Sequence, residues 1–437
     1  MRQLYLAALL VLFVGAGCAY AMPPYLELYT QADGLGGDSA HRVCIDREGK
    51  KWFGLSGKFV HVSSFDEVSW ESFSLPTSNW LTDMALDSAG RIWVVSTFGG
   101  NWLLQDGKFQ TSILPQFCIF SSALTFDLDW HLWVGGWNNG LWVAKHYASK
   151  GWETWFPLIN EAPWAFALGP EGRVWFVTSR YLYGSREGET SFETFYPWPG
   201  KDFVDMAVSN TGRIWLISGS CNGFGGAAPI IYSDDAEEWS VVGYPELSSK
   251  TETGTCVAIV GDTGIWFGFN AGAFWYDCTD WRWIDLGDGL ADIAVDETNG
   301  DVWFATWSGA VVMRGGPDAW PPVYMEISPI QDPADADKRA FIMGDIWFEM
   351  DLNLDFYLAV EDAHGNLLFA PQFTPEMRPM AQSFDAAIGT VVENYPLLEL
   401  DLSGVPEGSY RWFAACTHAG TMEFASNIAS CEWQFNR

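Results

Sequence analysis

Basic residues are scarce in this sequence. Its 437 residues include 23 Lys and Arg against 55 Asp and Glu, which gives a formal net charge of −32, and only 6 His. Nucleic acids and anionic lipid headgroups are bound chiefly through lysine and arginine, so a surface this acidic repels both. We therefore expect no nucleic-acid partner. The charge fits cations or basic partners, and it also fits the simpler role of keeping the chain soluble.

Motifs of the common catalytic sites are absent as well. The sequence has no G-x-S-x-G, no H-E-x-x-H, no C-x-x-C and no complete G-x-G-x-x-G or phosphate-binding loop. Its Gly clusters "GLGG" and "GFGG" lack the strand-to-helix setting that such loops need, and its histidines are scattered singly. The motifs thus name no catalytic residue, although they do not by themselves decide whether the chain is an enzyme.

Long apolar runs are missing beyond the first residues. The start, "MRQLYLAALLVLFVGAGCAYA", combines Arg2, an apolar core and the small-x-small site Ala19-Tyr20-Ala21. This pattern is typical of a signal peptide, residues 1–21, and is too short for a lasting span. We expect an exported, periplasmic or extracellular chain without a transmembrane span. Lipid attachment at Cys18 is a less favoured alternative, because the Leu expected three residues earlier is missing.

Cysteines are few, and their pairing is open. There are 8, of which the predicted cleavage after Ala21 would leave seven. Spacing suggests two local disulfides, Cys256 with Cys278 and Cys416 with Cys431, but sequence does not fix connectivity.

The sequence does contain a repeat with a period of about 40 residues. Each copy is a small-residue run, a D-x-x-G-like turn and an apolar run with Trp, as in "ALDSAGRIWVV" and "AVSNTGRIWLI". A second turn, an apolar run and a short aromatic strand follow, so each repeat predicts four strands, the blade of a β-propeller. The marker tryptophans, separated by 41, 40, 42, 40, 51 and 37 residues, are Trp52, Trp93, Trp133, Trp175, Trp215, Trp266 and Trp303.

The seven repeat tryptophans are predicted to be core residues. A four-stranded sheet cannot cover both of its faces, and a large ring on its second strand can fill the gap to the next sheet. Burying one Trp removes roughly 150–250 Å² from water, which is worth on the order of 4–6 kcal/mol before entropy. We expect packing, not ligand binding, from these rings.

The two ends of the repeat region are incomplete in a complementary way. "YLELYT" reads as an outer strand without a preceding blade, and the seventh repeat lacks an outer strand before Pro317. We expect Leu26–Thr30 to pair with the strand near Val311–Arg314 and so to close the ring without a free edge. The prediction for residues 22–318 is an all-β, seven-bladed propeller whose last blade is closed by the N-terminal strand.

The repeat pattern "DGL…DxxGxxWFG…G" resembles the two-component regulator propeller repeat. That repeat occurs in extracytoplasmic sensor regions of some bacterial histidine kinases and in secreted bacterial propellers. The resemblance covers about residues 25–316, is best in the first, second and fifth repeats, and departs in the third, where Trp130 replaces the turn Gly. It implies architecture and a link to sensing, and hardly specifies an activity.

Residues 319–437 have a different pattern. Strands of five to eight residues, separated by Gly-Asp, His-Gly and Pro-Glu-Gly turns, predict an antiparallel, Ig-like β-sandwich. The segment resembles a C-terminal β-sandwich module of secreted bacterial proteins, on the basis of Gly344-Asp345, Asp355-Phe356-Tyr357 and Gly408-Ser409-Tyr410. That resemblance implies an accessory role and no catalysis.

Three carboxylates occupy equivalent places at the start of the innermost strands. Asp83, Asp205 and Asp292 are each followed by Met or Ile and then Ala. If they line the axial channel, mutual repulsion would favour a bound Ca²⁺ or Mg²⁺. The alternative is that each Asp only caps the loop that leads into its own strand.

Aromatic residues also gather in the loops predicted to surround one channel mouth. Such loops are the usual ligand position of a propeller, and these rings could stack on sugars or anchor a peptide, with packing between blades as the alternative for each. The residues are Trp80, Phe98, Trp137, Trp164, Phe203 and Trp307.

The sequence therefore predicts an exported, non-catalytic propeller that binds a glycan or a protein, with a role in sensing or recognition. The alternative is a polysaccharide-active hydrolase or lyase that uses acidic residues at the channel mouth, since glycosidases need two carboxylates roughly 5–10 Å apart. A structural component of the cell surface is a third reading.

Overall fold

The fold was analysed in a computed structural model. The described residues are 25–56, 61–75, 81–97, 100–112, 120–147, 149–156, 160–185, 191–198, 202–219, 228–245, 247–261, 264–331, 339–362 and 364–435. The predicted signal peptide, residues 1–21, lies outside them. Two compact units are distinguished, and each is described separately. The repeat unit holds Pro24–Trp281 and Asp285–Gly316, and the C-terminal unit holds Arg282–Ile284 and Pro317–Arg437.

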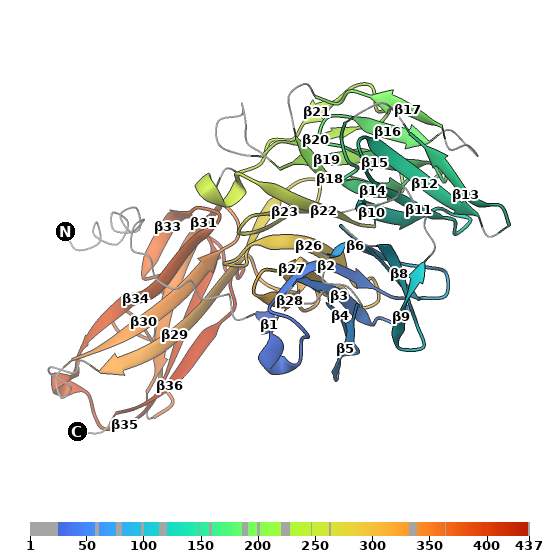
Figure 1. The fold of residues 1–437 in the computed structure, drawn as a ribbon. Coiled ribbons are helices and arrows are strands. Elements are labelled where there is room, and N and C mark those ends of the chain that lie inside the picture. The colour runs from blue at the N-terminus through green and yellow to red at the C-terminus, as the bar shows by residue number, and fades with distance from the viewer. Residues whose placement is uncertain are drawn as a thin grey trace. The chain divides into compact units, whose positions relative to one another are not determined.

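The described residues between 25 and 316 form seven four-stranded antiparallel sheets and contain no α-helix (Figure 1). In six sheets the strands follow chain order. The sheets are β2 (Ser39–Ile45), β3 (Lys51–Ser56), β4 (His61–Phe65), β5 (Trp70–Ser74); β6 (Leu81–Leu86), β7 (Ile92–Ser96), β8 (Gly100–Gln105), β9 (Lys108–Ser112); β10 (Phe120–Phe126), β11 (Leu132–Trp137), β12 (Leu141–Tyr147), β13 (Gly151–Trp155); β14 (Ala165–Leu168), β15 (Val174–Val177), β16 (Leu182–Ser185), β17 (Phe192–Phe195); β18 (Phe203–Val208), β19 (Ile214–Ser218), β20 (Ile230–Ser233), β21 (Ser240–Val241); β22 (Gly254–Val260), β23 (Gly264–Phe269), β24 (Gly272–Tyr276), β25 (Trp281–Asp285); and β26 (Leu290–Val295), β27 (Val302–Thr306), β28 (Gly309–Met313) with β1 (Leu26–Tyr29).

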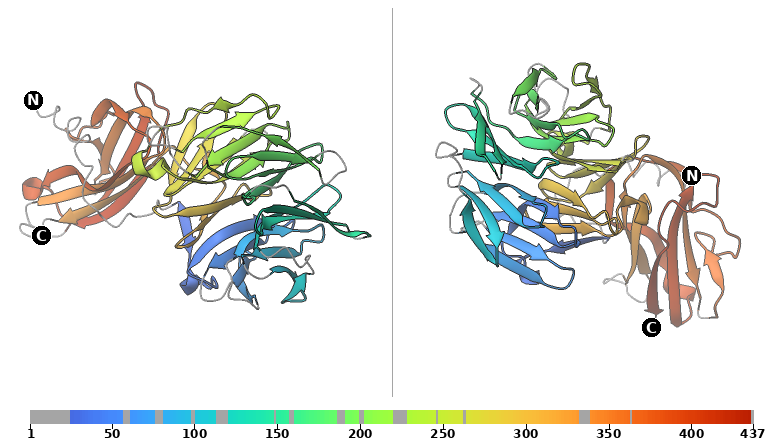
Figure 2. Two further views of the ribbon diagram at one scale, coloured as in Figure 1. Left: turned by 45° about the horizontal axis from the view of Figure 1, so that its top comes forward. Right: turned by 90° about the vertical axis from the view of Figure 1, so that its right-hand side faces the viewer.

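The first strands of the sheets form a closed cycle. Each contacts the first strand of the next sheet, in the order β2, β6, β10, β14, β18, β22 and β26, and β26 contacts β2 again. The sheets can be followed from two further directions in Figure 2. Short 3₁₀ helices, η1 (Gln31–Asp33) and η2 (Ser248–Thr251), lie in the connections.

The N-terminal strand closes the last sheet. Strand β1 is antiparallel to β28, with Leu26 opposite Met313 and Tyr29 opposite Ala310, as Figure 1 shows with the blue β1 beside β28. Arg314 reinforces the pair, with 3.3 Å between its Nη2 and Glu27 Oε2 and 2.7 Å between its Nη1 and Asp301 Oδ2. The predicted pairing between the two ends of the repeat region is confirmed.

The repeat tryptophans pack inside, as predicted, and in three repeats the structure shows the role of the Asp that lies six residues before the Trp. Six of them are buried, and Trp93 is half-buried. In the third repeat, Asp127 Oδ1 accepts the backbone N–H of His131 within the turn at 2.9 Å, while its Oδ2 accepts the Trp133 indole N–H at 3.0 Å. Trp52 and Trp93 donate in the same way to the Asp six residues earlier. The Asp therefore fixes both the turn and the ring.

Cations lie over several of these rings. Lys145 Nζ is 4.8 Å from the Trp133 ring centre, and the Arg173 guanidinium is 4.1 Å from that of Trp175. Such contacts add about 0.5–1 kcal/mol each at exposed sites and about 2 kcal/mol where they are shielded from water. Trp130, which replaces the turn Gly of the third repeat, has φ of 60°, the left-handed conformation that Gly adopts in the other turns.

The C-terminal unit has two antiparallel sheets around one core. One is three-stranded, in the order β29-β30-β34, and the other runs β32-β31-β35-β36 with β33 paired to β31. Buried residues from both sheets share one cluster, for example Met325, Ile342, Leu358 and Trp412. The elements are η3 (Pro317–Ala319), β29 (Val323–Gln331), β30 (Arg339–Phe348), β31 (Leu352–Glu361), β32 (Leu367–Phe369), β33 (Ala381–Ala386), β34 (Thr390–Asp401), η4 (Leu402–Gly404), β35 (Gly408–His418) and β36 (Ala429–Phe435).

The two suggested disulfides do not form. Cys256, Cys278, Cys416 and Cys431 are all free thiols. Cys416 and Cys431 lie on neighbouring strands, but the register pairs Cys431 with Trp412, so the two cysteines are not opposite each other. For Cys416 and Cys431 the spacing argument was wrong because it ignored strand register, which separates residues that are close in sequence.

Candidate functional site

A ring of equivalent positions lies on the innermost strands. In six of the seven first strands the register shifts immediately before one residue, which is the position of the predicted carboxylates. A bulge of this kind redirects a side chain. The six residues are Arg42, Asp83, Ala123, Asp205, Cys256 and Asp292.

Each of the three carboxylates joins its sheet to the next one. Asp205 accepts the N–H of Met206 in its own strand at 2.8 Å, and its other oxygen accepts the N–H of Val257 in β22 at 2.7 Å. Asp83 and Asp292 repeat both contacts. Asp83 accepts from Met84 and, in β10, from Leu124, whereas Asp292 accepts from Ile293 and, in β2, from Val43.

This arrangement explains the electrostatics of the ring. Burial raises the pKa of Asp205 to about 7 and that of Asp292 to about 6, despite their backbone hydrogen bonds. Burial also raises the pKa of Asp83, against the opposing effect of Arg42, whose Nε lies 3.3 Å from Asp83 Oδ1. Arg42 is the cation that opposes the raised pKa at all three carboxyls.

The carboxylates thus have a structural role that neither sequence interpretation described. They cap backbone N–H groups across the joints between sheets and not only in their own strands. Within the described residues, no group of three or more His, Cys, Asp or Glu is placed to hold a metal ion. A Ca²⁺ or Mg²⁺ site at Asp83, Asp205 and Asp292 stays a prediction, and calcium titration of metal-free protein tests it.

Asp205 makes the stability of the repeat unit depend on pH. Its pKa is about 7 in the folded chain and 3.8 ordinarily, so between about pH 4 and pH 7 the folded state holds a proton that the unfolded state has lost. The contribution of Asp205 to the free energy of unfolding therefore falls as pH rises through this window. Between about pH 4 and pH 7, the change in the free energy of unfolding should differ between wild type and Asp205→Asn by more than about 1 kcal/mol, with the larger decrease in wild type. Urea unfolding at a series of pH values measures this difference.

Asp234→Asn is the matched control. A hydrogen bond from Arg213 holds the pKa of this surface carboxyl below its ordinary value, so it is ionised in both states over the same window. The difference between wild type and this variant should not change between about pH 4 and pH 7. A wild-type advantage over Asp205→Asn that grows with pH would show that the buried carboxyl prefers its ionised form.

The predicted mouth aromatics separate into three groups. Trp80 and Phe98 lie outside the described residues. Phe203 is fully buried in a cluster with Trp175, so its ring does not reach the surface. Trp137, Trp164 and Trp307 lie where first strands begin or second strands end, the mouth end of the sheets.

Hydrogen bonds fix two of these indoles. Trp164, 47% exposed, donates its indole N–H to Ser179 Oγ at 3.2 Å, and half-buried Trp137 donates to Asn160 Oδ1 at 2.9 Å. Trp137 ends β11, and Trp164 precedes β14 of the next sheet, whose first strand contacts β10. The two residues therefore belong to adjacent sheets.

A glycine positions the third indole. Trp307 is 60% exposed, and a Cβ on Gly289 would come within 2.4 Å of its ring. The absence of a side chain at Gly289 lets the ring approach the backbone, and the N–H of Trp307 donates to the Gly289 carbonyl at 2.9 Å. Trp307 belongs to the last sheet, so it is separate from the pair Trp137 and Trp164.

Sequence reasoning missed the residues that hold the indoles. Asn160 carries no local signal, because it reaches Trp137 from the segment before the next sheet. Ser179 follows β15 and meets Trp164, which precedes β14, only because these two strands pair. Gly289 could have been found, since it lies in the repeated "DGL" segment before a first strand. Rigid rings with polar neighbours are suited to stacking on a sugar or an apolar side chain.

No protein-family model and no curated protein matches this chain. No helix among the described residues is long and apolar enough to cross a membrane. Similarity is found with solved structures.

Three of these structures are representative. Virginiamycin B lyase from Staphylococcus aureus is 15% identical, with a TM-score of 0.55 over 66% of this chain and 97% of that one. The extracellular domain of a putative hybrid two-component system from B. thetaiotaomicron is 15% identical, with a TM-score of 0.56 over 94% of this chain and 57% of that one. The WD40 domain of Neurospora crassa Pan2 is 13% identical, with a TM-score of 0.50 over 63% and 88%.

At these identities the similarities show the fold alone. WD40 domains are β-propellers, and the four-stranded antiparallel sheets of the repeat unit agree with that architecture. The resemblance to two-component propellers that the repeats indicated is confirmed at the level of structure. The chain has a β-propeller fold like that of extracellular two-component domains.

Proposed function

We propose that this chain is an exported, non-catalytic binding module. In this proposal residues 22–318 form a seven-bladed propeller closed by the N-terminal strand, and residues 319–437 form an accessory β-sandwich. The closed cycle of first strands and the β1–β28 pairing support the blade count, and the core shared by two sheets supports the sandwich. Export rests on the predicted signal peptide, with lipid attachment at Cys18 as the alternative.

One observation carries the binding role: the mouth end presents exposed indoles that are already held in place. Trp164 and Trp307 expose about half of their surface although hydrogen bonds or close backbone contact fix them. A fixed ring loses little conformational freedom on binding, which favours affinity. Glycans are the first expected ligands, since a sugar face stacks on an indole, and a protein loop is the second.

A glycan array combined with a reducing-end assay tests the class of function. Binding without product supports a recognition module. Release of product would favour the hydrolase or lyase alternative. If neither glycan binding nor product is seen, the result favours a protein ligand or a structural role on the cell surface.

Truncating an indole at the mouth should reduce affinity without reducing stability. We expect Trp307→Ala to weaken binding of the strongest array ligand about tenfold or more, the effect of removing a central aromatic contact, as measured by calorimetric titration. Trp130→Ala is the control, because Trp130 is also exposed, at 43%, but lies in the β10–β11 turn at the other end of its sheet. Equal losses in both variants would place the ligand elsewhere.

A further inference from the structure

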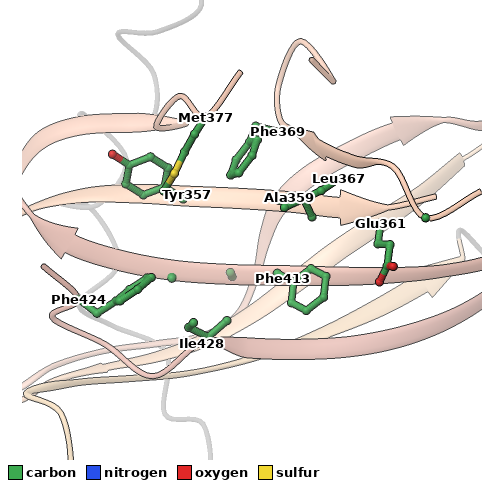
Figure 3. Close-up of a pocket in the computed structure, with 12 residues that line it drawn as sticks. Tyr357, Ala359, Glu361, Leu367, Phe369, Met377, Phe413, Phe424 and Ile428 are labelled. Atoms are coloured by element: carbon green, nitrogen blue, oxygen red, sulfur yellow. The ribbon is translucent and has the colours of Figure 1, made fainter. Parts of the chain in front are cut away.

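An apolar groove crosses one face of the C-terminal unit (Figure 3). Its floor is formed by β31 and β35, through Tyr357, Ala359 and Phe413. Phe369 and Met377 stand on one side, and Phe424 and Ile428 on the other, as the sticks in Figure 3 show. The volume is about 470 Å³, within the size range of ligand-binding sites.

The groove exists because β31 is apolar on both faces. Phe356, Leu358 and Val360 point into the core shared by the two sheets, whereas the alternate residues Tyr357 and Ala359 face the groove and are nevertheless buried. A strand with one face in water would normally alternate apolar and polar residues. The small side chains of Ala359 and Ala415 leave the space between the aromatic residues.

Apolar surface continues beyond the groove. Phe424 and Ile428 are 50% and 56% exposed, and Met422, which does not line the groove, is 61% exposed. Contiguous exposed apolar side chains mark interaction sites, and Met suits adaptable contacts. Because the patch is larger than the groove, it fits a polypeptide segment better than a small molecule.

Charge defines the occupant further. Glu361 lies at one end of the groove, as Figure 3 shows, and its carboxylate is 4.0 Å from Arg411, which lies closer to Glu432 at 2.7 Å. Glu423 adjoins the lining residue Phe424 in sequence, whereas Met377 is flanked by Glu376 and Arg378, which pair with each other. The chain as a whole carries −32. A basic residue beside an apolar run complements this surface, whereas an acidic one is repelled.

We propose that this groove binds a polypeptide segment of a partner protein in which apolar side chains alternate with lysine or arginine. The apolar side chains would fill the space over Ala359 and Ala415, and a basic residue would pair with Glu361. This site is independent of the mouth aromatics and of the function proposed for them.

The test uses the full chain and two short fluorescent peptides, one of alternating Leu and Lys and one of alternating Leu and Glu, with binding followed by anisotropy. We expect saturable binding of the Leu-Lys peptide alone. Ile428→Ser should weaken it about tenfold, the loss for one buried aliphatic side chain. Ile330→Ser is the matched control, because Ile330 is 45% exposed in the same unit but outside the groove, and its effect should stay within about twofold.

A second variant tests the volume. Ala359→Phe fills the floor of the groove and should abolish binding of the Leu-Lys peptide. If this variant does not fold, Ile428→Ser still tests the proposal, because Ile428 is exposed. No saturable binding, or equal affinity for wild type and Ile428→Ser, would overturn the proposal, the latter by assigning binding to the acidic surface alone. If octylamine displaced the fluorescent Leu-Lys peptide as effectively as the unlabelled peptide does, the groove would be assigned to small amines. A dimer of the chain that Ile428→Ser dissociates in sedimentation would assign it to a second copy.

Discussion

Removal of residues 25–29 is expected to destabilise the repeat unit by about 5 kcal/mol or more. Tyr25 and Leu26 are buried, and full burial of such side chains is worth about 1.5–3 kcal/mol each. Tyr29 packs against the Trp303 ring at 5.8 Å and the Phe65 ring at 5.2 Å. The deletion would also expose the edge of β28, with its unpaired backbone groups.

Urea unfolding followed by tryptophan fluorescence measures this loss. The control is a synthetic peptide of residues 25–30, which should restore part of the lost stability when it is added to the truncated chain, because it can pair with β28 again. If the truncated chain unfolds at the wild-type urea concentration, the N-terminal strand does not close the ring.

Trp175→Ala is expected to lower the free energy of unfolding by about 3–5 kcal/mol. The ring is buried in a cluster with Phe203, Leu216 and Ile231, and the Arg173 guanidinium lies over it. Truncation leaves a cavity between two neighbouring sheets and removes the aromatic partner of Arg173. The same urea titration gives the magnitude.

Trp164→Ala is the matched control for packing. Trp164 is half exposed and lies just before the strand that leads to Trp175, so its truncation should cost less than about 1 kcal/mol. A loss below about 0.5 kcal/mol for Trp175→Ala would show that the repeat rings do not hold the sheets together.

The fold followed closely from the sequence because its signals are local and repeated. The D-x-x-G turn and the Trp that follows it have a direct counterpart in the Asp87–Trp93 hydrogen bond. The incomplete repeats at both ends have theirs in the β1–β28 pairing. Periodicity lets several weak signals support one another.

The sites followed less closely because they depend on pairs of sheets. The sequence shows that Asp83, Asp205 and Asp292 occupy equivalent positions. One of the two hydrogen-bond donors of each, however, is a backbone N–H of the neighbouring sheet, and no spacing rule identifies that N–H. Phe203 was placed in a loop although it begins β18 and faces the core. The disulfides failed for a similar reason, since register decides which cysteines meet.

The C-terminal groove had a sequence signal that was not used. The run Leu354–Val360 shows no alternation of apolar and polar residues, which indicates a strand covered on both faces. Only the three-dimensional arrangement shows that one of these faces is a groove and not a closed core.

Hydrogen exchange with and without the strongest ligand from the glycan array tests the binding proposal most directly. The account predicts slower exchange in peptides that contain Trp137, Trp164 and Trp307 and their neighbours Asn160, Ser179 and Gly289. Exchange slowed only in the turns at the other end of the sheets, such as Asp46–Lys50 and Asp127–His131, would contradict it.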